Sequence, residues 1–234
     1  MNRKDFLAAS ATAAASSGVA AASEIPGGTH LVERRSDFDA AAFASVVGRP
    51  AAIRQVFEAV AFRSSVLGNV KNALNGLQFG FGYPADAIVV ALAGHGSSAV
   101  YAYADRIWTR YRLGEFLKLS DAAGAPVVSN VFLKRHAPID VGSDPDDAAG
   151  MYQDASIEML QRRGLIVLAC HTAIEEQARA IFTRGFAPAA MSAADVAADI
   201  LTNLIPGTVV VPSMVAAIAV LQATYHYTYL TLAL

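Results

Sequence analysis

The chain has 234 residues, of which 54% are hydrophobic and 16% are charged, and its formal net charge is −2. This composition excludes a largely disordered chain, and the length is sufficient for one substantial α/β domain or two small ones. The sequence has no basic stripe, so we expect no nucleic-acid partner.

The first 22 residues have the pattern of an export signal. A basic start at Arg3 and Lys4 leads into a mildly apolar run of Ala and Ser that ends in small residues at 20–22. This pattern is typical of a cleavable secretory signal, and its Arg-Lys-x-Phe-Leu core is similar to a twin-arginine signal. We predict a signal peptide over residues 1–22, a periplasmic or otherwise exported location, and no membrane attachment once the signal is removed. The alternative is an amphipathic N-terminal helix.

The rest of the chain alternates between apolar strands and amphipathic helices. Residues 23–52 are predicted to be a linker or N-terminal arm with a short helix near 39–46, and residues 53–234 to be the folded domain. Hydrophobic periodicity, interrupted by Gly and Pro, predicts strands at 53–61, 87–93, 127–131, 165–169 and 208–211, and a β-prone end at 225–232. The same signals predict helices at 65–79, 101–112, 151–163, 173–184, 193–204 and 212–223. This rhythm predicts a three-layer α/β/α domain with a mostly parallel sheet.

Cys170 is the only cysteine in the chain, and it follows the apolar run 165–169 directly. Ligands of open parallel sheets bind outside the carboxyl ends of the strands. A thiol in that place can lie beside a helix N-terminus and an imidazole, here His171, and both favour the thiolate. One cysteine cannot form a disulfide within its chain, so Cys170 is reactive and free, buried and inert, or paired between subunits.

A second candidate is the glycine-rich segment after the strand at 87–93. Backbone amides of such a loop can cradle an anion, so we predict Gly94, His95, Gly96 and Ser97 to be anion- or substrate-binding residues. The spacing is similar to a dinucleotide-binding loop, but the following strand does not end in an acidic residue, which argues against NAD. The alternative is a tight turn that allows close packing.

Other chemistries find little support in the sequence. The five histidines lack metal-ligand spacing, and no Gly-x-Ser-x-Gly motif occurs, so we expect no metal and no cofactor. Tyr225, Tyr227 and Tyr229 alternate along the last segment, which places them on one face of a strand. Such a face suits a subunit interface or the wall of a pocket.

Four segments occur in an order that is more informative than any one of them. They are Val70-Lys71-Asn72-Ala73-Leu74-Asn75, the strand 88–93 with Gly94, Cys170-His171-Thr172-Ala173, and residues 203–213 with Leu221-Gln222 and Tyr225-x-Tyr227. Together, over about residues 53–230, they resemble the DsrE/DsrF-like (DsrEFH/YchN-like) family. The chain departs from the family pattern before residue 53, between residues 170 and 203, and at His226.

The resemblance implies a compact α/β fold that assembles into homotrimers or homohexamers. It also implies, for some members, a persulfide carried on the cysteine at this strand end. We therefore expect an exported sulfur-relay protein of sulfurtransferase type that acts through Cys170, with His171 as a secondary helper and a sulfur donor or acceptor protein as partner. The alternative is a non-catalytic, oligomeric small-ligand-binding or structural protein in which Cys170 is buried and inert.

Overall fold

The computed structural model describes residues 32–232, so the predicted signal peptide lies outside the described residues. Five strands form one sheet in the order β4-β3-β2-β1-β5, and each neighbouring pair is parallel. The strands are β1 (Ile53–Ala59), β2 (Ile88–Gly94), β3 (Leu165–Cys170), β4 (Val209–Val211) and β5 (Thr228–Leu232). The predicted α/β class with a parallel sheet is confirmed.

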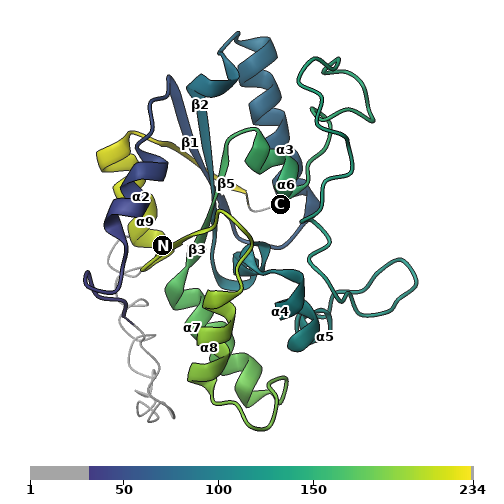
Figure 1. The fold of residues 1–234 in the computed structure, drawn as a ribbon, viewed down its shortest axis with the longest axis vertical. Helices are drawn as coiled ribbons and strands as arrows, with labels where there is room; N and C mark the ends of the chain where they lie inside the picture. Colours follow the sequence, from purple (N-terminus) through teal and green to yellow (C-terminus); the bar gives the residue numbers. More distant parts are fainter. Residues whose placement is uncertain (1–31, 233–234) are drawn as a thin grey trace, which may run out of the picture.

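Helices cover both faces of this sheet (Figure 1), which gives the three layers that the sequence predicted. α2 and α9 lie on one side of the sheet, and α3 and α6 lie on the other. The α-helices are α2 (Ala40–Val47), α3 (Ser64–Asn75), α4 (Asp105–Arg110), α5 (Leu113–Leu117), α6 (Ile157–Arg162), α7 (His171–Thr183), α8 (Ala193–Thr202) and α9 (Met214–Tyr225). A π-helical turn, Gly76–Gly80, extends α3, and two 3-10 segments, Ala85–Ala87 and η4 (Gly96–Ala102), flank β2.

The centre of the core is formed by β2 and β3, in which every residue is buried. Strands covered by helices on both faces lose the polar–apolar alternation of half-exposed strands, which explains the continuous apolar runs at 87–93 and 165–169. Both strands end at the same edge of the sheet, because they are parallel neighbours paired up to Gly94 and Ala169. Among the helices of residues 32–232, none is long and apolar enough to cross a membrane.

The helix expected in the N-terminal arm packs onto the domain. α2 begins after Asp39, whose carboxylate accepts the Ala42 N–H at 2.8 Å, and it buries Phe43 and Val47. The Phe43 ring lies edge-on to the ring of Tyr225, and the hydroxyl of Tyr227 donates to the Val47 carbonyl at 2.9 Å. Residues 40–47 are therefore part of the same core as the sheet.

Two expectations between residues 101 and 131 are wrong. The strand expected at 127–131 is a loop, in which the Asn130 side chain donates to the Tyr101 and Tyr103 carbonyls and Val128 is 67% exposed. Its β-branched residues therefore find no partner strand. The helix expected at 101–112 is split, because η4 ends at Ala102 and α4 begins only at Asp105.

Two helix starts were also placed too early by the sequence. The helix expected at 151–163 begins at Ile157, because the Asp154 carboxylate accepts backbone N–H groups of His136, Ala137 and Ser156 and holds the chain in a loop. Ser156 then caps the helix by accepting the Met159 N–H. The helix expected from residue 212 begins at Met214, after Ser213.

Candidate functional site

Cys170 lies where β3 passes directly into α7, and only 5% of it is exposed. Its Sγ accepts the N–H of Ala173, in the first turn of α7, at 3.4 Å. It also accepts the N–H of Met214, the first residue of α9, at 3.3 Å. The first amides of a helix lack partners within that helix and carry the positive end of its dipole. The sulfur therefore lies where the N-termini of two helices converge, and it accepts one backbone N–H from each.

Two buried polar residues form a hydrogen-bonded chain from α7 to the loop after β2. Tyr103 is fully buried, and its hydroxyl donates to Oε1 of Gln177 in α7 at 2.8 Å. Gln177 in turn donates from Nε2 to the Gly96 carbonyl. Burial raises the pKa of Tyr103, and the electrostatic effect of the nearby Cys170 raises it further. Tyr103 is thus held as a neutral hydrogen-bond donor near Cys170.

His171 is buried in the first turn of α7, and its Nε2 faces Oε1 of Glu175, one helical turn along, at 3.8 Å. Side chains four residues apart lie on one face of a helix, so this pairing follows from the helix itself. The polar neighbour that the structure assigns to the imidazole is therefore Glu175. The role of His171 as a helper of Cys170 stays a prediction.

The predicted anion loop is a tight, heavily bonded turn. A Cβ on Gly94 would lie 2.9 Å from the Ser98 carbonyl oxygen, and Gly96 has a φ of +56°, so both positions favour glycine. The Ser98 hydroxyl accepts the His95 N–H at 3.0 Å and contacts the carbonyls of Ala59 and His95. These contacts fit the close-packing alternative, and the anion-binding role of Gly94, His95, Gly96 and Ser97 remains a prediction.

The sequence did not reveal that the His95 side chain belongs to a polar cluster at the carboxyl edge of β1, β2 and β5. His95 Nε2 lies 2.7 Å from Oε1 of Glu58, at the end of β1. Oε2 of Glu58 accepts hydrogen bonds from Tyr229 and Thr231 of β5, the latter at 2.9 Å. Burial alone would raise the pKa of Glu58, but the hydrogen bonds from Tyr229, His95 and Thr231 outweigh it and lower the pKa.

The strand register places this cluster and Cys170 on the same face of the sheet. Glu58 pairs with Ala93, and Ala93 pairs with Leu168. Paired residues of parallel strands point to one face, and so do residues two apart along a strand. His95 and Cys170, each two residues further on in extended backbone, continue that face. The structure therefore brings His95, Glu58 and Cys170 to one edge and one side of the sheet.

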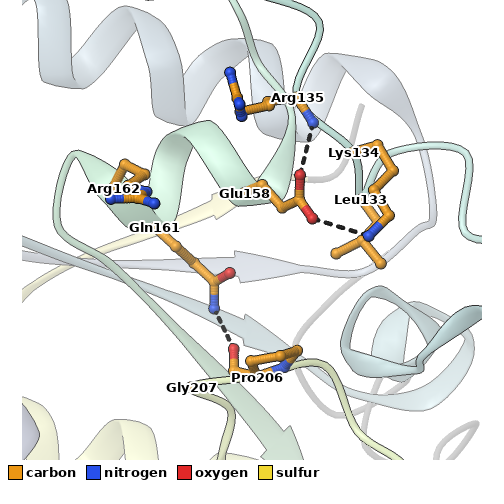
Figure 2. A pocket seen from close by; sticks show the side chains of 8 residues that line it. All are labelled: Leu133, Lys134, Arg135, Glu158, Gln161, Arg162, Pro206 and Gly207. Atoms are coloured by element: carbon orange, nitrogen blue, oxygen red, sulfur yellow. Dashed lines mark hydrogen bonds and ion pairs between the residues drawn. The ribbon is translucent and has the colours of Figure 1, made fainter. Parts of the chain in front are cut away.

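A further feature of the described residues lies at the other edge of the sheet. A cavity of about 590 Å³ is formed by the loop before α6, by α6 itself and by the turn before β4, at the amino edge of the sheet (Figure 2). Within it, Glu158 accepts from Lys134 Nζ and from the Arg135 backbone N–H, each at 3.0 Å, while Gln161 donates to the Pro206 carbonyl. Sequence reasoning placed no functional residue here. Residues 32–232 contain no group of three or more His, Cys, Asp or Glu side chains suited to a metal ion.

Comparisons of the chain with protein-family models, with curated proteins and with solved structures find no match. The resemblance to the DsrE/DsrF-like family therefore stays a prediction from the sequence.

Proposed function

We propose that this chain is a DsrE-like sulfur carrier that holds a persulfide on Cys170. The observation that carries the proposal is the pair of helix N-termini, α7 and α9, whose amides both donate to Sγ. Sulfur transfer needs a thiolate, and amides at helix N-termini favour that form. The resemblance of residues 170–173 to the cysteine element of the family supports the same chemistry.

The transfer balances without an added oxidant or reductant. The Cys170 thiolate attacks the outer sulfur of a donor persulfide, R–S–SH, and a new S–S bond forms as the donor's S–S bond breaks. The electron pair of the broken bond leaves on the donor thiolate, R–S⁻, and the proton stays on the outer sulfur now carried by Cys170. An acceptor thiolate then attacks this outer sulfur, and the Cys170 thiolate leaves, held again by the amides of Ala173 and Met214.

His95 gives the predicted anion loop an ionisable side chain that a donor can reach. Its side chain is 30% exposed, while Glu58 fixes its orientation from the other side. An imidazole oriented by a carboxylate can accept or donate a proton at the edge of the sheet where the thiol lies. The neutral amides of Gly96 and Ser97 belong to the same turn.

A second function, a non-catalytic binding or structural role, has its own supporting observation. The sulfur is nearly fully buried and serves as the N-cap of α7, while its bond to Met214 ties α7 to the start of α9. An inert cysteine could do both. The two functions differ in whether the native thiol reacts.

A thiol-reactivity experiment separates them. Native protein is incubated with iodoacetamide, or with inorganic polysulfide as sulfur donor, and the mass of the peptide containing Cys170 is measured. The carrier function predicts alkylation of the folded protein and a gain of one sulfur atom on Cys170. Reaction only after unfolding, with no added sulfur, would contradict it. Cys170→Ser is the matched variant, because serine is a good N-cap but holds no persulfide.

We also propose that the mature protein is exported and forms a homotrimer or homohexamer. Support for assembly comes from α9, which is apolar on its outer side as well as its inner side: Val215 is 66% exposed, and Val220 is also exposed. Contiguous exposed apolar surface is typical of interfaces, and a subunit packed on α9 would cover these two valines. Light scattering on the protein lacking residues 1–22 tests it: a monomeric mass would refute the assembly, and an unprocessed N-terminus in the producing cell would refute the signal.

A further inference from the structure

Arg163 is a buried cation that has no anionic partner among residues 32–232. It lies two residues before the start of β3, at the amino edge of the sheet, and only 9% of it is exposed. Its guanidinium donates to the side-chain oxygen of Asn75 at 2.7 Å and reaches the Tyr152 carbonyl at 3.5 Å. Both acceptors are neutral, and no described carboxylate lies within 4.0 Å of it.

Buried charges in proteins are normally paired, because removing one from water is costly. Burial lowers the pKa of Arg163 to about 10, as expected for a desolvated cation that no described carboxylate neutralises. The Tyr152 ring, 5.0 Å from the guanidinium carbon, offers only a weak cation–π contact in compensation.

Arg163 also lines a cavity of about 280 Å³, which is large enough for a small organic anion. Most of the wall is apolar, and Arg162 is the only other ionisable cation in it. The lining residues are Leu74, Gln78, Ala85, Ile88, Val141, Met151, Tyr152, Arg162 and Arg163. Val141, on the loop over the cavity, is 80% exposed, so a ligand beneath it would cover apolar surface that is now in water. Arg162 also lines the wider basic cavity of Figure 2.

We propose that this cavity binds a small carboxylate with an apolar body, its carboxylate on Arg163 and its body against Leu74, Ile88 and Met151. A planar guanidinium matches a carboxylate through two parallel N–H···O bonds. The largely apolar wall disfavours a strongly hydrated dianion such as inorganic phosphate, because Arg162 and Gln78 are the only further side-chain donors among the charged and amide residues that line it, and they do not replace its full hydration shell. The site is separate from Cys170, which lies at the opposite edge of the sheet.

The experiment measures binding of octanoate to the full mature protein by isothermal titration calorimetry, with octan-1-ol and inorganic phosphate as comparison probes. Octanoate is expected to bind saturably, and octanol and phosphate each about tenfold or more weaker, since one lacks the charge and the other the apolar body. No saturable octanoate binding, or equal binding of octanol, overturns the proposal.

Arg163→Met keeps the length of the side chain and removes its charge. It is expected to reduce octanoate affinity about tenfold or more, whereas Arg163→Lys, which keeps the charge but not the fork, has a smaller effect. Arg184→Met is the matched control. Like Arg163, Arg184 donates to a backbone carbonyl, that of Phe116, and its guanidinium lies over an aromatic ring, that of Phe116, at 4.2 Å. Unlike Arg163, it lines none of the cavities described. Undiminished binding in Arg163→Met, or an equal loss in Arg184→Met, overturns the proposal. Should Arg163→Met fail to fold, Arg163→Lys and the octanol comparison on the unaltered chain decide the matter.

Discussion

Replacing Glu58 by Gln tests whether the polar cluster at the carboxyl edge holds β5 onto β1. The carboxylate of Glu58 accepts from His95, Tyr229 and Thr231, and Thr231 is also its register partner on β5. Hydrogen bonds to a charged group contribute roughly 1.5–3 kcal/mol when buried, and exposed ones much less. Because Tyr229 and Thr231 are exposed and Gln keeps one acceptor oxygen, Glu58→Gln should lower the free energy of unfolding by about 1–2 kcal/mol.

The pH dependence of this loss is fixed by the direction of the pKa shift. The pKa of Glu58 is lowered in the folded state from its ordinary value of 4.5, so the folded protein favours the ionised carboxylate. The stabilisation is therefore complete above that ordinary value and disappears as the pH falls through the lower, folded-state pKa. Gln does not titrate, so the difference between the two proteins should be largest near neutrality and shrink in acid.

Urea unfolding followed by circular dichroism, at about pH 7 and about pH 4, measures both quantities. Glu115→Gln is the matched control, because Glu115 pairs only with Arg112, at 3.2 Å on an exposed helix surface, and should change stability by less than about 0.5 kcal/mol. Equal effects of the two substitutions, or a Glu58→Gln deficit that does not change with pH, would refute the reasoning.

Two further substitutions probe the loop and the N-terminal helix, with unfolding free energies as the measurement. Gly94→Ala should destabilise by about 1–3 kcal/mol, because its Cβ would lie 2.9 Å from the Ser98 carbonyl oxygen. Gly68→Ala, in the middle of α3 with nothing within 4 Å, should instead stabilise by up to about 1 kcal/mol; similar values for the two glycines would contradict the close approach. Phe43→Ala should cost about 3 kcal/mol, since its ring is buried against Tyr225, and a cost well under about 1 kcal/mol would mean that α2 is not part of the core.

The sequence correctly predicted the helices and strands whose position depends on local residue patterns. β2 and β3 are continuous apolar runs, and the start of α8 is marked by Ser192 and Asp195, which form a reciprocal capping box. Gly164, with a φ of +103°, ends the segment before β3 as a helix-terminating glycine should. These local signals agree with the tertiary contacts of the fold.

The sequence-based predictions of helices and strands failed where contacts between distant residues override the local conformational preference. The β-branched residues at 127–131 have strand propensity, but Asn130 is bound by the carbonyls of Tyr101 and Tyr103, and the segment is held as a loop. Likewise, apolar periodicity extended α6 backwards through Asp154, whose carboxylate binds amides 17 and 18 residues away. Neither of these long-range contacts can be inferred from the spacing of apolar and polar residues in the sequence.

The candidate site was predictable only in part, for the same reason. A lone cysteine after an apolar run pointed to Cys170, but its second donor, Met214, is 44 residues away, and Tyr229 and Glu58 are 171 residues apart. Bringing Glu58 to His95 requires knowing that β1 lies beside β2 and that β5 adds to the far side of β1. Strand order is a property of the whole chain, so the cluster became visible only in the fold.

The two proposed sites stand at opposite ends of one strand, which makes their tests independent. Arg163 precedes β3 and Cys170 ends it, and six residues of strand at about 3.3 Å each separate them by about 20 Å. At that distance the direct interaction between two unit charges is below about 1 kcal/mol at an effective dielectric constant of about 20, and the residues between are apolar and tightly packed. Octanoate bound at Arg163 should therefore leave the alkylation rate of Cys170 unchanged. If the alkylation rate instead changes with the occupancy of the carboxylate site, then β3 and its covering helices must shift together. The two sites would then be energetically coupled rather than independent.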